Sequence, residues 1–405
     1  MSDILLISLS GEDHPGVTAG IAAILAEQGV NVLDIGQAVI HDTLSLGMLV
    51  EIPAGCDAAP LRAAVEACAA ELGMRARISQ VDEHSYAEWV GAQGRPRYII
   101  TLLARKLSAD QIARVTRVVS AHQLNIDSIT RLSGRIPLGE LPAQSKACVE
   151  FSARGPLPDA ADFRRELLEV ASELDIDLAF QQDNMYRRNR RLVAFDMDST
   201  LIEAEVIDEL AKRAGVGEQV SAITERAMRG ELDFSESFRA RVALLEGLEE
   251  TALATVAGEL KITEGAEHLI STLRALGYRT AILSGGFTYF ARFLQQRLGI
   301  DYVFANELEI EHGRVTGRVT GDIVDGQRKA QLLRRLAEAE GIDLQQVIAV
   351  GDGANDLPML SIAGLGVAFR AKPLVKQSAE QSISTLGLDA ILYLLGFSDR
   401  YQRGA

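Results

Sequence analysis

Residues 192–200 read Leu-Val-Ala-Phe-Asp-Met-Asp-Ser-Thr, an apolar run followed by two carboxylates with one residue between them. The run predicts a buried strand, and the carboxylates would then lie at its C-terminal end. Such carboxylates repel each other, and burial penalises each charge unless something compensates it. A divalent cation is the usual compensation, and Mg²⁺ accepts hard oxygen ligands of this kind. We therefore predict a metal site here, with one carboxylate free to attack or to move protons.

The composition is typical of a soluble globular protein with more than one core. The chain has 405 residues, of which 47% are hydrophobic and 24% are charged, so two or three domains are expected. No apolar stretch approaches the roughly 20 residues of a membrane span. The N-terminus lacks a secretory signal, and the three cysteines show no metal-ligand pairing. We expect a cytoplasmic protein with reduced thiols and no membrane partner.

The net charge of −15 argues against nucleic acid as a partner. The same field would repel a phosphate substrate, so a phosphate site would have to be built locally from Mg²⁺, basic side chains and backbone N–H groups. The dense basic run at residues 187–191 directly precedes the predicted strand at residues 192–195. We interpret it as a solvated linker rather than an RNA contact.

The first part of the chain, residues 1–92, predicts a ferredoxin-like βαββαβ domain. The loop at residues 11–16 is rich in turn residues, and Pro60 suits the first turn of a helix. Strands are expected at 4–9, 30–40, 44–52 and 75–81, and helices at 17–28 and 60–72.

A weak internal repeat predicts a second, divergent ferredoxin-like domain at residues 96–184. Residues 28–32 align with residues 122–126, each after an amphipathic helix, and the second copy carries an insertion at residues 134–144. Strands are expected at 98–103, 148–153 and 178–182, and a helix at 161–174.

From residue 190 to residue 398 the pattern changes to parallel α/β. The mostly helical segment of about residues 206–260 predicts a cap over the C-terminal edge of the sheet, where open α/β sheets bind their ligands. Strands are expected at 192–195, 279–283, 302–305, 347–350 and 366–368.

Four polar segments of this last domain lie at predicted strand ends or helix starts. They are residues 196–200, Ser284-Gly285-Gly286, Lys329 and residues 351–356, which read Gly-Asp-Gly-Ala-Asn-Asp. Each alone is weak, because a Ser-Gly-Gly is usually a turn and a lysine that opens a helix usually faces solvent. The glycine spacing of the last segment is not a dinucleotide fingerprint. Together, in this order, the four segments form a specific set.

On these segments, residues 190–395 resemble the haloacid-dehalogenase-like phosphatases, and among them the family that hydrolyses O-phospho-L-serine. The two preceding domains resemble ACT domains, which are amino-acid-binding regulatory modules. The resemblance implies a Rossmann-like parallel sheet with a helical cap. It also implies Mg²⁺-dependent hydrolysis through an aspartyl-phosphate, as the last step of serine synthesis.

The resemblance also assigns the catalytic roles. Asp196 would be the nucleophile, and Asp198 would be the general acid and then the base that activates water. Lys329 would pair with the phosphate and with Asp196. Mg²⁺ would be held by the carboxylate of Asp196, the backbone carbonyl of Asp198 and Asp352.

Other residues would bind the phosphate or support the site. Ser284 and the N–H of Gly285 would hold phosphate oxygens, with Asn355 nearby. Asp356 would act through contacts behind the metal ligands or by orienting the lysine.

Substrate specificity is expected from the cap. Glu205 matches the family position that binds the substrate ammonium, and Arg241 matches the position that binds the α-carboxylate, which a guanidinium can bond bidentately. Met228 and Phe234 match residues that shield the site. A neutral sugar phosphate would need neither charged partner.

The loop at residues 13–18 resembles the ligand loop of ACT domains and leads into a helix N-terminus suited to a carboxylate. We expect L-serine as an effector that acts as a feedback inhibitor, and a homodimer formed by pairing of ACT domains. A purely structural or dimerising domain without a ligand is the alternative. The expected ligand residues are Asp13, Gly16, Thr18, Asn31 and Asp34.

Two other functions remain open from the sequence. The same aspartyl-phosphate chemistry could transfer the phosphoryl group from phosphoserine to another alcohol, such as homoserine. The chain could also be an amino-acid sensor that no longer turns over, although the intact set Asp196, Asp198, Lys329 and Asp352 argues against that. A role as a protein phosphatase is disfavoured, because the cap would hinder a large substrate.

Overall fold

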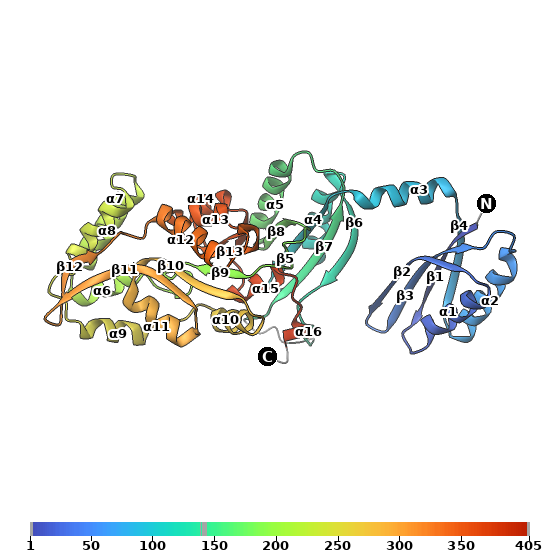
Figure 1. The fold of residues 1–405 in the computed structure, drawn as a ribbon, viewed down its shortest axis with the longest axis horizontal. Coiled ribbons are helices and arrows are strands. Elements are labelled where there is room, and N and C mark those ends of the chain that lie inside the picture. Colours follow the sequence, from blue (N-terminus) through green and yellow to red (C-terminus); the bar gives the residue numbers. More distant parts are fainter. Residues whose placement is uncertain (1–2, 138, 140–143, 403–405) are drawn as a thin grey trace. The chain divides into compact units, whose positions relative to one another are not determined.

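The computed structural model describes residues 3–137, 139 and 144–402, and the chain divides into two compact units. Unit 1 is Met1–Arg95 and unit 2 is Pro96–Ala405. The described residues form three β-sheets, one in unit 1 and two in unit 2 (Figure 1). Part of the predicted insertion, at residues 138 and 140–143, lies outside the described residues.

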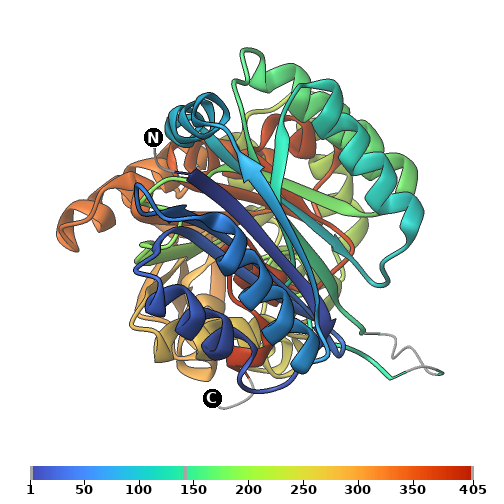
Figure 2. The same cartoon turned by 90° about the vertical axis from the view of Figure 1, so that its right-hand side faces the viewer.

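Unit 1 has the predicted ferredoxin-like βαββαβ order. Its antiparallel sheet has the strand order β2-β3-β1-β4, and α1 and α2 lie side by side on one face of it (Figure 2). The elements are β1 (Asp3–Glu12), α1 (Val17–Glu27), β2 (Asn31–Ile40), β3 (Thr43–Ile52), α2 (Ala58–Glu71) and β4 (Arg75–Val81).

The alternation of apolar residues explains this arrangement. Leu5, Ile7 and Leu9 of β1 point to one face of the sheet and are buried with Ile21 and Leu25 of α1. The strand extends further into the predicted loop than expected, because residues 11 and 12 pair with β3. Helix α3 (Glu83–Gly91) follows and was not predicted, since it buries none of its residues and therefore has no apolar periodicity to detect.

Unit 2 begins with the predicted second copy. Its sheet, here the second ferredoxin-like sheet, has the order β6-β7-β5-β8, which matches that of unit 1. Both copies shift register at corresponding places, after Val32 and after Ile126. The structure therefore confirms the repeat. The elements are β5 (Arg97–Ala104), α4 (Ala109–Ala121), β6 (Asn125–Arg131), β7 (Ala147–Arg154), α5 (Ala160–Leu174) and β8 (Asp177–Gln182).

The large sheet of unit 2 has the strand order β12-β11-β10-β9-β13-β14-β15. All five predicted strands are present, and β9 lies between β10 and β13 with parallel pairing on both sides. β12 and β15 were not predicted. The strands are β9 (Leu192–Phe195), β10 (Arg279–Phe287), β11 (Tyr302–Glu311), β12 (Arg314–Thr320), β13 (Val347–Gly351), β14 (Leu365–Phe369) and β15 (Gln381–Ile383).

Strand β9, which directly precedes Asp196, is buried on both faces of this sheet. Val193 and Phe195 belong to one hydrophobic core, and Leu192 and Ala194 belong to the core on the other face. A strand covered on both sides reads as a continuous apolar run, which is why it stands out in the sequence. Figure 1 shows helices above and below the sheet: α10 (Ala266–Ala275) and α11 (Thr288–Leu298) on one side, α12 (Gly326–Ala339), α13 (Leu357–Ile362) and α14 (Pro373–Ser378) on the other.

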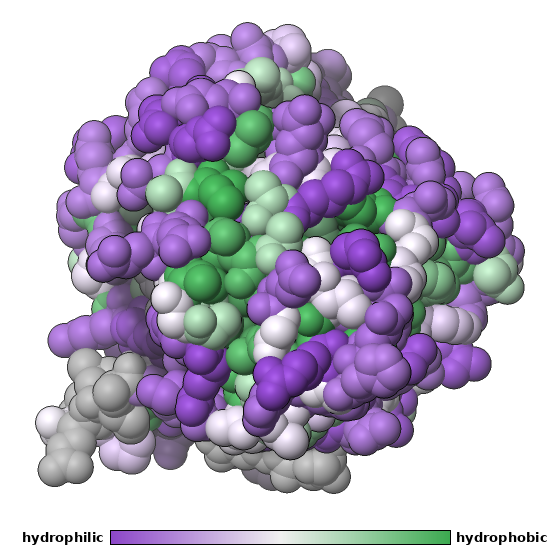
Figure 3. Space-filling view, turned by 90° about the vertical axis from the view of Figure 1, so that its left-hand side faces the viewer, coloured by the Kyte–Doolittle hydropathy of each residue, from purple (hydrophilic) through white to green (hydrophobic). Residues whose placement is uncertain are grey.

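The predicted cap segment is helical. An antiparallel bridge between Ile202 and Ile262 joins the two ends of this segment. Figure 3 faces the end of unit 2 that carries α7, α8 and β12, and it shows a hydrophobic area bordered by hydrophilic residues. The cap helices are α6 (Val206–Ala214), α7 (Gly217–Met228), α8 (Phe234–Ala243) and α9 (Thr251–Glu259). Two short helices, α15 (Ile391–Leu394) and α16 (Asp399–Gln402), end the described chain.

The basic run at residues 187–191 is not the solvated linker that we expected. Arg187 and Arg190 are 1% and 5% exposed. Arg187 pairs with Glu150 of β7, and Arg190 donates to the carbonyl of Gln345 at 3.0 Å. The run therefore joins the second ferredoxin-like sheet to the large sheet. Among the residues that the structure describes, none of the helices is long and apolar enough to cross a bilayer.

Candidate active site

Asp196 lies directly after β9, at the C-terminal edge of the large sheet. Its backbone N–H donates to Val350 of β13 at 2.8 Å, which places the residue between two parallel strands. Its Oδ1 lies 2.9 Å from Nζ of Lys329, and the same Nζ lies 2.7 Å from Oδ1 of Asp356. Lys329 and Asp356 are fully buried. Two strand ends and the first turn of α12 thus meet in one ion cluster.

The cluster keeps the lysine charged. Burial alone would lower the pKa of Lys329, but Asp196 and Asp356 outweigh it and raise that pKa above its ordinary value. For Asp196, in contrast, the surroundings favour the uncharged form. Burial and the charge of Asp356 raise the pKa of Asp196, and Lys329 only partly offsets this. The cluster therefore holds more negative charge than one ammonium can balance.

This excess charge fits a divalent cation. Asp196, Asp352 and Asp356 each offer one carboxylate oxygen, and these atoms lie within 4.8 Å of one another. Burial and Asp356 raise the pKa of Asp352 to about 7, although Thr200 donates to Asp352 Oδ1 at 3.2 Å. Buried hard oxygens that resist ionisation without a counter-charge are suited to Mg²⁺.

Asp356 is already engaged through both oxygens. Its Oδ1 accepts from Lys329, and its Oδ2 accepts from the N–H of Gly353 at 3.0 Å. The Asp356 carboxyl group also lies so close to Gly351 that a Cβ at residue 351 would overlap it, so this position requires glycine. These contacts suit the expected role of Asp356 in orienting the lysine.

The loop after Asp196 places Asp198 and Glu205. Ser199 has a φ of 56°, the left-handed region, and its Oγ donates to Oε1 of Glu205 at 2.8 Å. Oδ1 of Asp198 accepts from the N–H of Val206 at 3.2 Å, at the start of α6. Burial and the charges of Glu205 and Asp196 raise the pKa of Asp198. A raised pKa suits a carboxyl group that has to give up a proton as a general acid.

The Ser284-Gly285-Gly286 turn lies at the end of β10. Oγ of the buried Ser284 accepts from the N–H of Gly286 at 2.9 Å. A Cβ on Gly286 would lie 2.7 Å from Oδ2 of Asp198, so the turn directly adjoins the expected general acid. Asn306 was not predicted from the sequence; its side chain donates to the carbonyl of Gly285 and accepts from the N–H of Val324, both at 2.8 Å. Its signal was a polar residue directly after the predicted strand at 302–305.

The cap brings Phe234 and Arg241 to the same region. A Cβ on Gly285 would lie 2.8 Å from Cζ of Phe234, so that ring covers the turn. Arg241 is half-buried and donates to the carbonyl of Ser237 at 3.4 Å. Burial lowers the pKa of Arg241, against the charges of Asp208, Glu205 and Asp198. Arg241, the expected carboxylate-binding residue, therefore lies close enough to Glu205, the expected ammonium partner, for their charges to interact.

Two further predicted residues can be placed only in part. Asn355 lies in a short helical turn beside Gly353, where a Cβ would overlap its Oδ1. The side chain of Met228 lies outside the described residues, although its backbone ends α7.

In unit 1, the predicted ligand loop lines a depression of about 500 Å³. Asp13, Gly16 and Thr18 are among the lining residues. The structure does not bring Asn31 or Asp34 into this lining, because Asn31 donates to Glu51 and Asp34 accepts from the N–H that follows it.

The chain matches known protein families over two stretches. Residues 193–361 match the haloacid dehalogenase-like hydrolases, and residues 3–79 match the ACT domain. The crystal structure of a HAD-family hydrolase from Salmonella enterica serovar Typhi is 31% identical, with a TM-score of 0.64. It covers 73% of this chain and 98% of that one. The fold is thus that of a haloacid dehalogenase-like hydrolase, and Asp196 lies within the matched residues.

Full-length relatives then define the family within this class. A phosphoserine phosphatase of Streptomyces coelicolor is 43% identical over 97% of this chain and 92% of its own length. One of Mycobacterium tuberculosis is 42% identical over 97% of this chain and 93% of its own length. The chain belongs to the phosphoserine phosphatases, which are phosphomonoester hydrolases.

Proposed function

We propose that this chain hydrolyses O-phospho-L-serine to L-serine and phosphate with Mg²⁺, as the last step of serine synthesis. The observation that carries the proposal is the ion cluster in which Lys329 is shared by Asp196 and Asp356, with Asp352 beside them. Membership of the chain in the phosphoserine phosphatases supports O-phospho-L-serine as the substrate. The geometry of the ion cluster supports attack by Asp196 on phosphorus.

In the first step, the Asp196 carboxylate attacks phosphorus, and the bond from phosphorus to the serine oxygen breaks. Asp198 gives its proton to that oxygen, which leaves as the serine hydroxyl. In the second step, Asp198 takes a proton from water, and the oxygen of this water attacks phosphorus. Phosphate is released and the Asp196 carboxylate is restored. The raised pKa of Asp198 suits a residue that alternates between acid and base.

Charge neutralisation is the main task of the surrounding groups. Lys329 stabilises negative charge on the phosphoryl group while holding Asp196 in place. Mg²⁺ would be held by Asp196, Asp352 and the backbone carbonyl of Asp198. When bound, it supplies a positive charge for the phosphoryl oxygens and for the crowded carboxylates. This local charge explains how a chain of net charge −15 can admit an anionic substrate.

Binding of the amino-acid part rests on two charged residues. Glu205 would accept the substrate ammonium, and Arg241 would bind the α-carboxylate bidentately. Ser284, the N–H of Gly285 and Asn355 would hold phosphate oxygens. Phe234, together with Met228, would exclude water when the cap covers the site.

Phosphate release from O-phospho-L-serine by the purified chain tests the proposal, with Mg²⁺ and with EDTA. Asp196→Asn removes the nucleophile, and Asp110→Asn on the exposed surface of α4 is the matched control. We expect Mg²⁺-dependent release in the wild type and the control, and none in Asp196→Asn. Folded wild type without release above that variant would favour the amino-acid sensor.

The phosphotransferase alternative differs only in the acceptor. The assay is therefore repeated with homoserine, and the products are separated. Serine and free phosphate in equal amounts support the hydrolase, whereas a phosphorylated homoserine product would support the transferase.

Arg241→Met tests the proposed specificity. Loss of the guanidinium should raise the KM for O-phospho-L-serine and leave the KM for p-nitrophenyl phosphate unchanged, because that ester has no α-carboxylate. Equal changes for both substrates would contradict the proposed carboxylate contact.

For regulation, we propose that L-serine binds the depression lined by Asp13, Gly16 and Thr18, and that the chain is a homodimer. Serine should then lower the rate, and Thr18→Ala should weaken that inhibition without changing the uninhibited rate. Absence of serine binding by calorimetry would leave unit 1 with a structural role. Sedimentation of the full chain tests the dimer.

A further inference from the structure

A shared carboxylate connects the two sheets of unit 2. Glu264 lies just before α10, and Arg105 lies just after β5 of the second ferredoxin-like sheet. Nη1 and Nη2 of Arg105 each donate to one oxygen of Glu264 at 2.8 Å. Such a bidentate pair fixes the guanidinium in the plane of the carboxylate as well as at its distance.

The same carboxylate also holds an arginine of the large sheet. Nη2 of Arg370 donates to Oε2 of Glu264 at 2.9 Å, and its guanidinium lies 5.2 Å from the ring centroid of Phe369. The backbone N–H of Arg370 donates to Ile383 at 2.7 Å. Arg370 is therefore restrained at both its backbone and its side chain.

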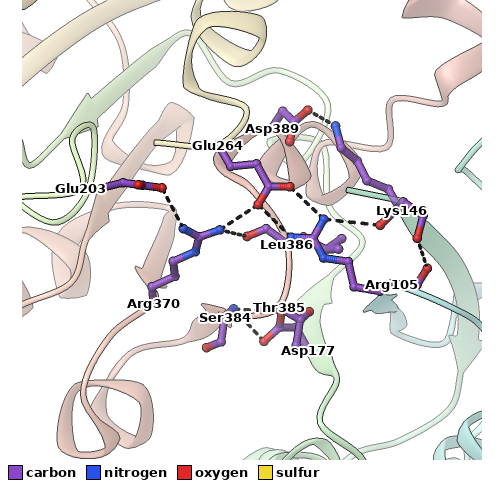
Figure 4. A network of polar contacts seen from close by, with 11 residues as sticks. Arg105, Lys146, Asp177, Glu203, Glu264, Arg370, Ser384, Thr385, Leu386 and Asp389 are labelled. Atoms are coloured by element: carbon purple, nitrogen blue, oxygen red, sulfur yellow. Dashed lines mark hydrogen bonds and ion pairs between the residues drawn. The ribbon is translucent and has the colours of Figure 1, made fainter. Parts of the chain in front are cut away.

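Arg370 in turn reaches the loop that follows the nucleophile. Its Nη1 lies 3.7 Å from Oε1 of Glu203 (Figure 4). Glu203 belongs to the turn in which Ser199 N–H donates to Ala204 at 3.1 Å. Glu205, the proposed ammonium partner, lies two residues after Glu203. Ser199 Oγ also donates to Oε1 of Glu205 at 2.8 Å, so this turn links the positions of the two glutamates.

Other contacts keep the two sheets from sliding past each other. Lys146 pairs with Asp389, and the Asp177 carboxylate accepts from the backbone N–H groups of Ser384 and Thr385 at 2.8–2.9 Å (Figure 4). The position of Arg105 relative to Glu264 is thus set by the whole junction.

We propose that Arg370 is a positioning residue for substrate selectivity. Through Glu203 it places Glu205, and through Glu264 it is itself placed by Arg105 of the second ferredoxin-like sheet. The inference rests on the proposed function, since it takes Glu205 as the ammonium partner. Asp196 and Lys329 are held by β9, β13 and α12, which this relay does not touch, so the chemistry on phosphorus should persist when the relay is cut.

Steady-state kinetics of Arg370→Met test this inference, with O-phospho-L-serine and p-nitrophenyl phosphate as substrates. We expect the KM for phosphoserine to rise about fivefold, the modest effect of a partly exposed ion pair, with kcat nearly unchanged. The aryl phosphate has no ammonium, so its KM should stay the same. Arg105→Met should act in the same direction.

Matched variants separate positioning from general damage. Arg165→Met removes an exposed arginine of α5 that pairs only within its own helix among the described residues, and it should change neither KM. Arg370→Lys keeps a cation and should give an intermediate KM. Glu203→Gln alters an exposed side chain, so it should fold even if Arg370→Met does not, and it should also raise the KM for phosphoserine.

Two failures are distinguishable. Wild type that hydrolyses the aryl phosphate but not phosphoserine would overturn the proposed substrate. Wild type that hydrolyses phosphoserine, with Arg370→Met and Glu203→Gln leaving its KM unchanged or raising both KM values equally, would overturn the positioning role.

Discussion

At the scale of single residues, the site is organised by the buried ammonium of Lys329. Burial alone would favour the neutral amine, so the charge exists because two carboxylates face it. Each carboxylate needs that ammonium in return. The residues are therefore interdependent for stability as well as for chemistry.

Replacement of Lys329 by methionine should test this dependence. The change leaves Asp196 and Asp356 buried without a cation, and breaking a buried ion pair in this way costs about 3–5 kcal/mol. Loss of an electrostatic contact to the phosphoryl group should lower kcat about 100-fold or more. Urea unfolding and phosphate release measure the two effects.

Lys212→Met is the control, because Lys212 forms an exposed pair with Glu209 on α6. Its stability and rate should match the wild type. Wild-type stability in Lys329→Met would contradict this dependence.

Asp352 predicts a pH dependence of stability. Its pKa is raised from 3.8 to about 7 in the folded protein. The stability contributed by the protonated form is present below pH 3.8 and is lost as the pH rises through 7. In EDTA, the melting temperature of the wild type should therefore fall between pH 5 and pH 8 by more than that of Asp352→Asn.

Mg²⁺ should reverse this loss. Protons compete with the cation for the carboxylates, so the rise in melting temperature on adding Mg²⁺ should be larger at pH 8 than at pH 5. Asp352→Asn should show a smaller rise at both pH values. An equal rise in wild type and variant would place the cation elsewhere.

At the scale of elements, the ends of β9, β10 and β13 approach one another so closely that a Cβ does not fit at Gly286 or at Gly351. Gly286 adjoins Asp198, and Gly351 adjoins Asp356. Parallel strands end at the same edge of the sheet, so three separate stretches of sequence supply one site there.

Gly286→Ala should therefore impair catalysis. The added Cβ would lie 2.7 Å from Asp198 Oδ2 and 2.8 Å from Cε of Met197, and a displacement of the acid should lower kcat at least about tenfold. Gly258→Ala, on the exposed face of α9 with open space around it, is the control. It should leave kcat unchanged and stabilise the protein by about 0.5–1 kcal/mol. An unchanged kcat in Gly286→Ala would show that the turn can shift freely.

At the scale of the whole molecule, units 1 and 2 differ in how they relate to catalysis. Unit 2 contains the ion cluster, the cap and the second ferredoxin-like sheet, whereas the depression at residues 13–18 lies in unit 1. Each unit has its own hydrophobic core.

A fragment of residues 96–405 should consequently fold and hydrolyse phosphoserine at a rate close to that of the full chain. It should no longer respond to serine if the effector binds unit 1. Circular dichroism and phosphate release with added serine check both points. Serine inhibition retained by the fragment would move the effector site into unit 2.

Much of the fold was readable from local pattern. The run at residues 192–195 and the alternation in β1 and β3 predicted strands correctly, because burial on two faces or one leaves a direct trace in the sequence. β12 and β15 escaped prediction, since β12 pairs only at the edge of the sheet and β15 spans only Gln381–Ile383. The burial of Arg187 was also hidden, because its partner Glu150 comes from a distant strand.

The sequence by itself determined the chemistry that we propose, since Asp196, Asp198 and Asp352 follow predicted strands, Lys329 opens a predicted helix, and the four together carry the family resemblance. Only the tertiary structure decided how those groups share charge. The pairing of Lys329 with Asp356, the clamp of Asn306 on Gly285 and the link from Arg105 to Glu203 join residues far apart in the chain. Hydrogen bonds and ion pairs act over a few ångströms, so such contacts exist only once the sheets have packed.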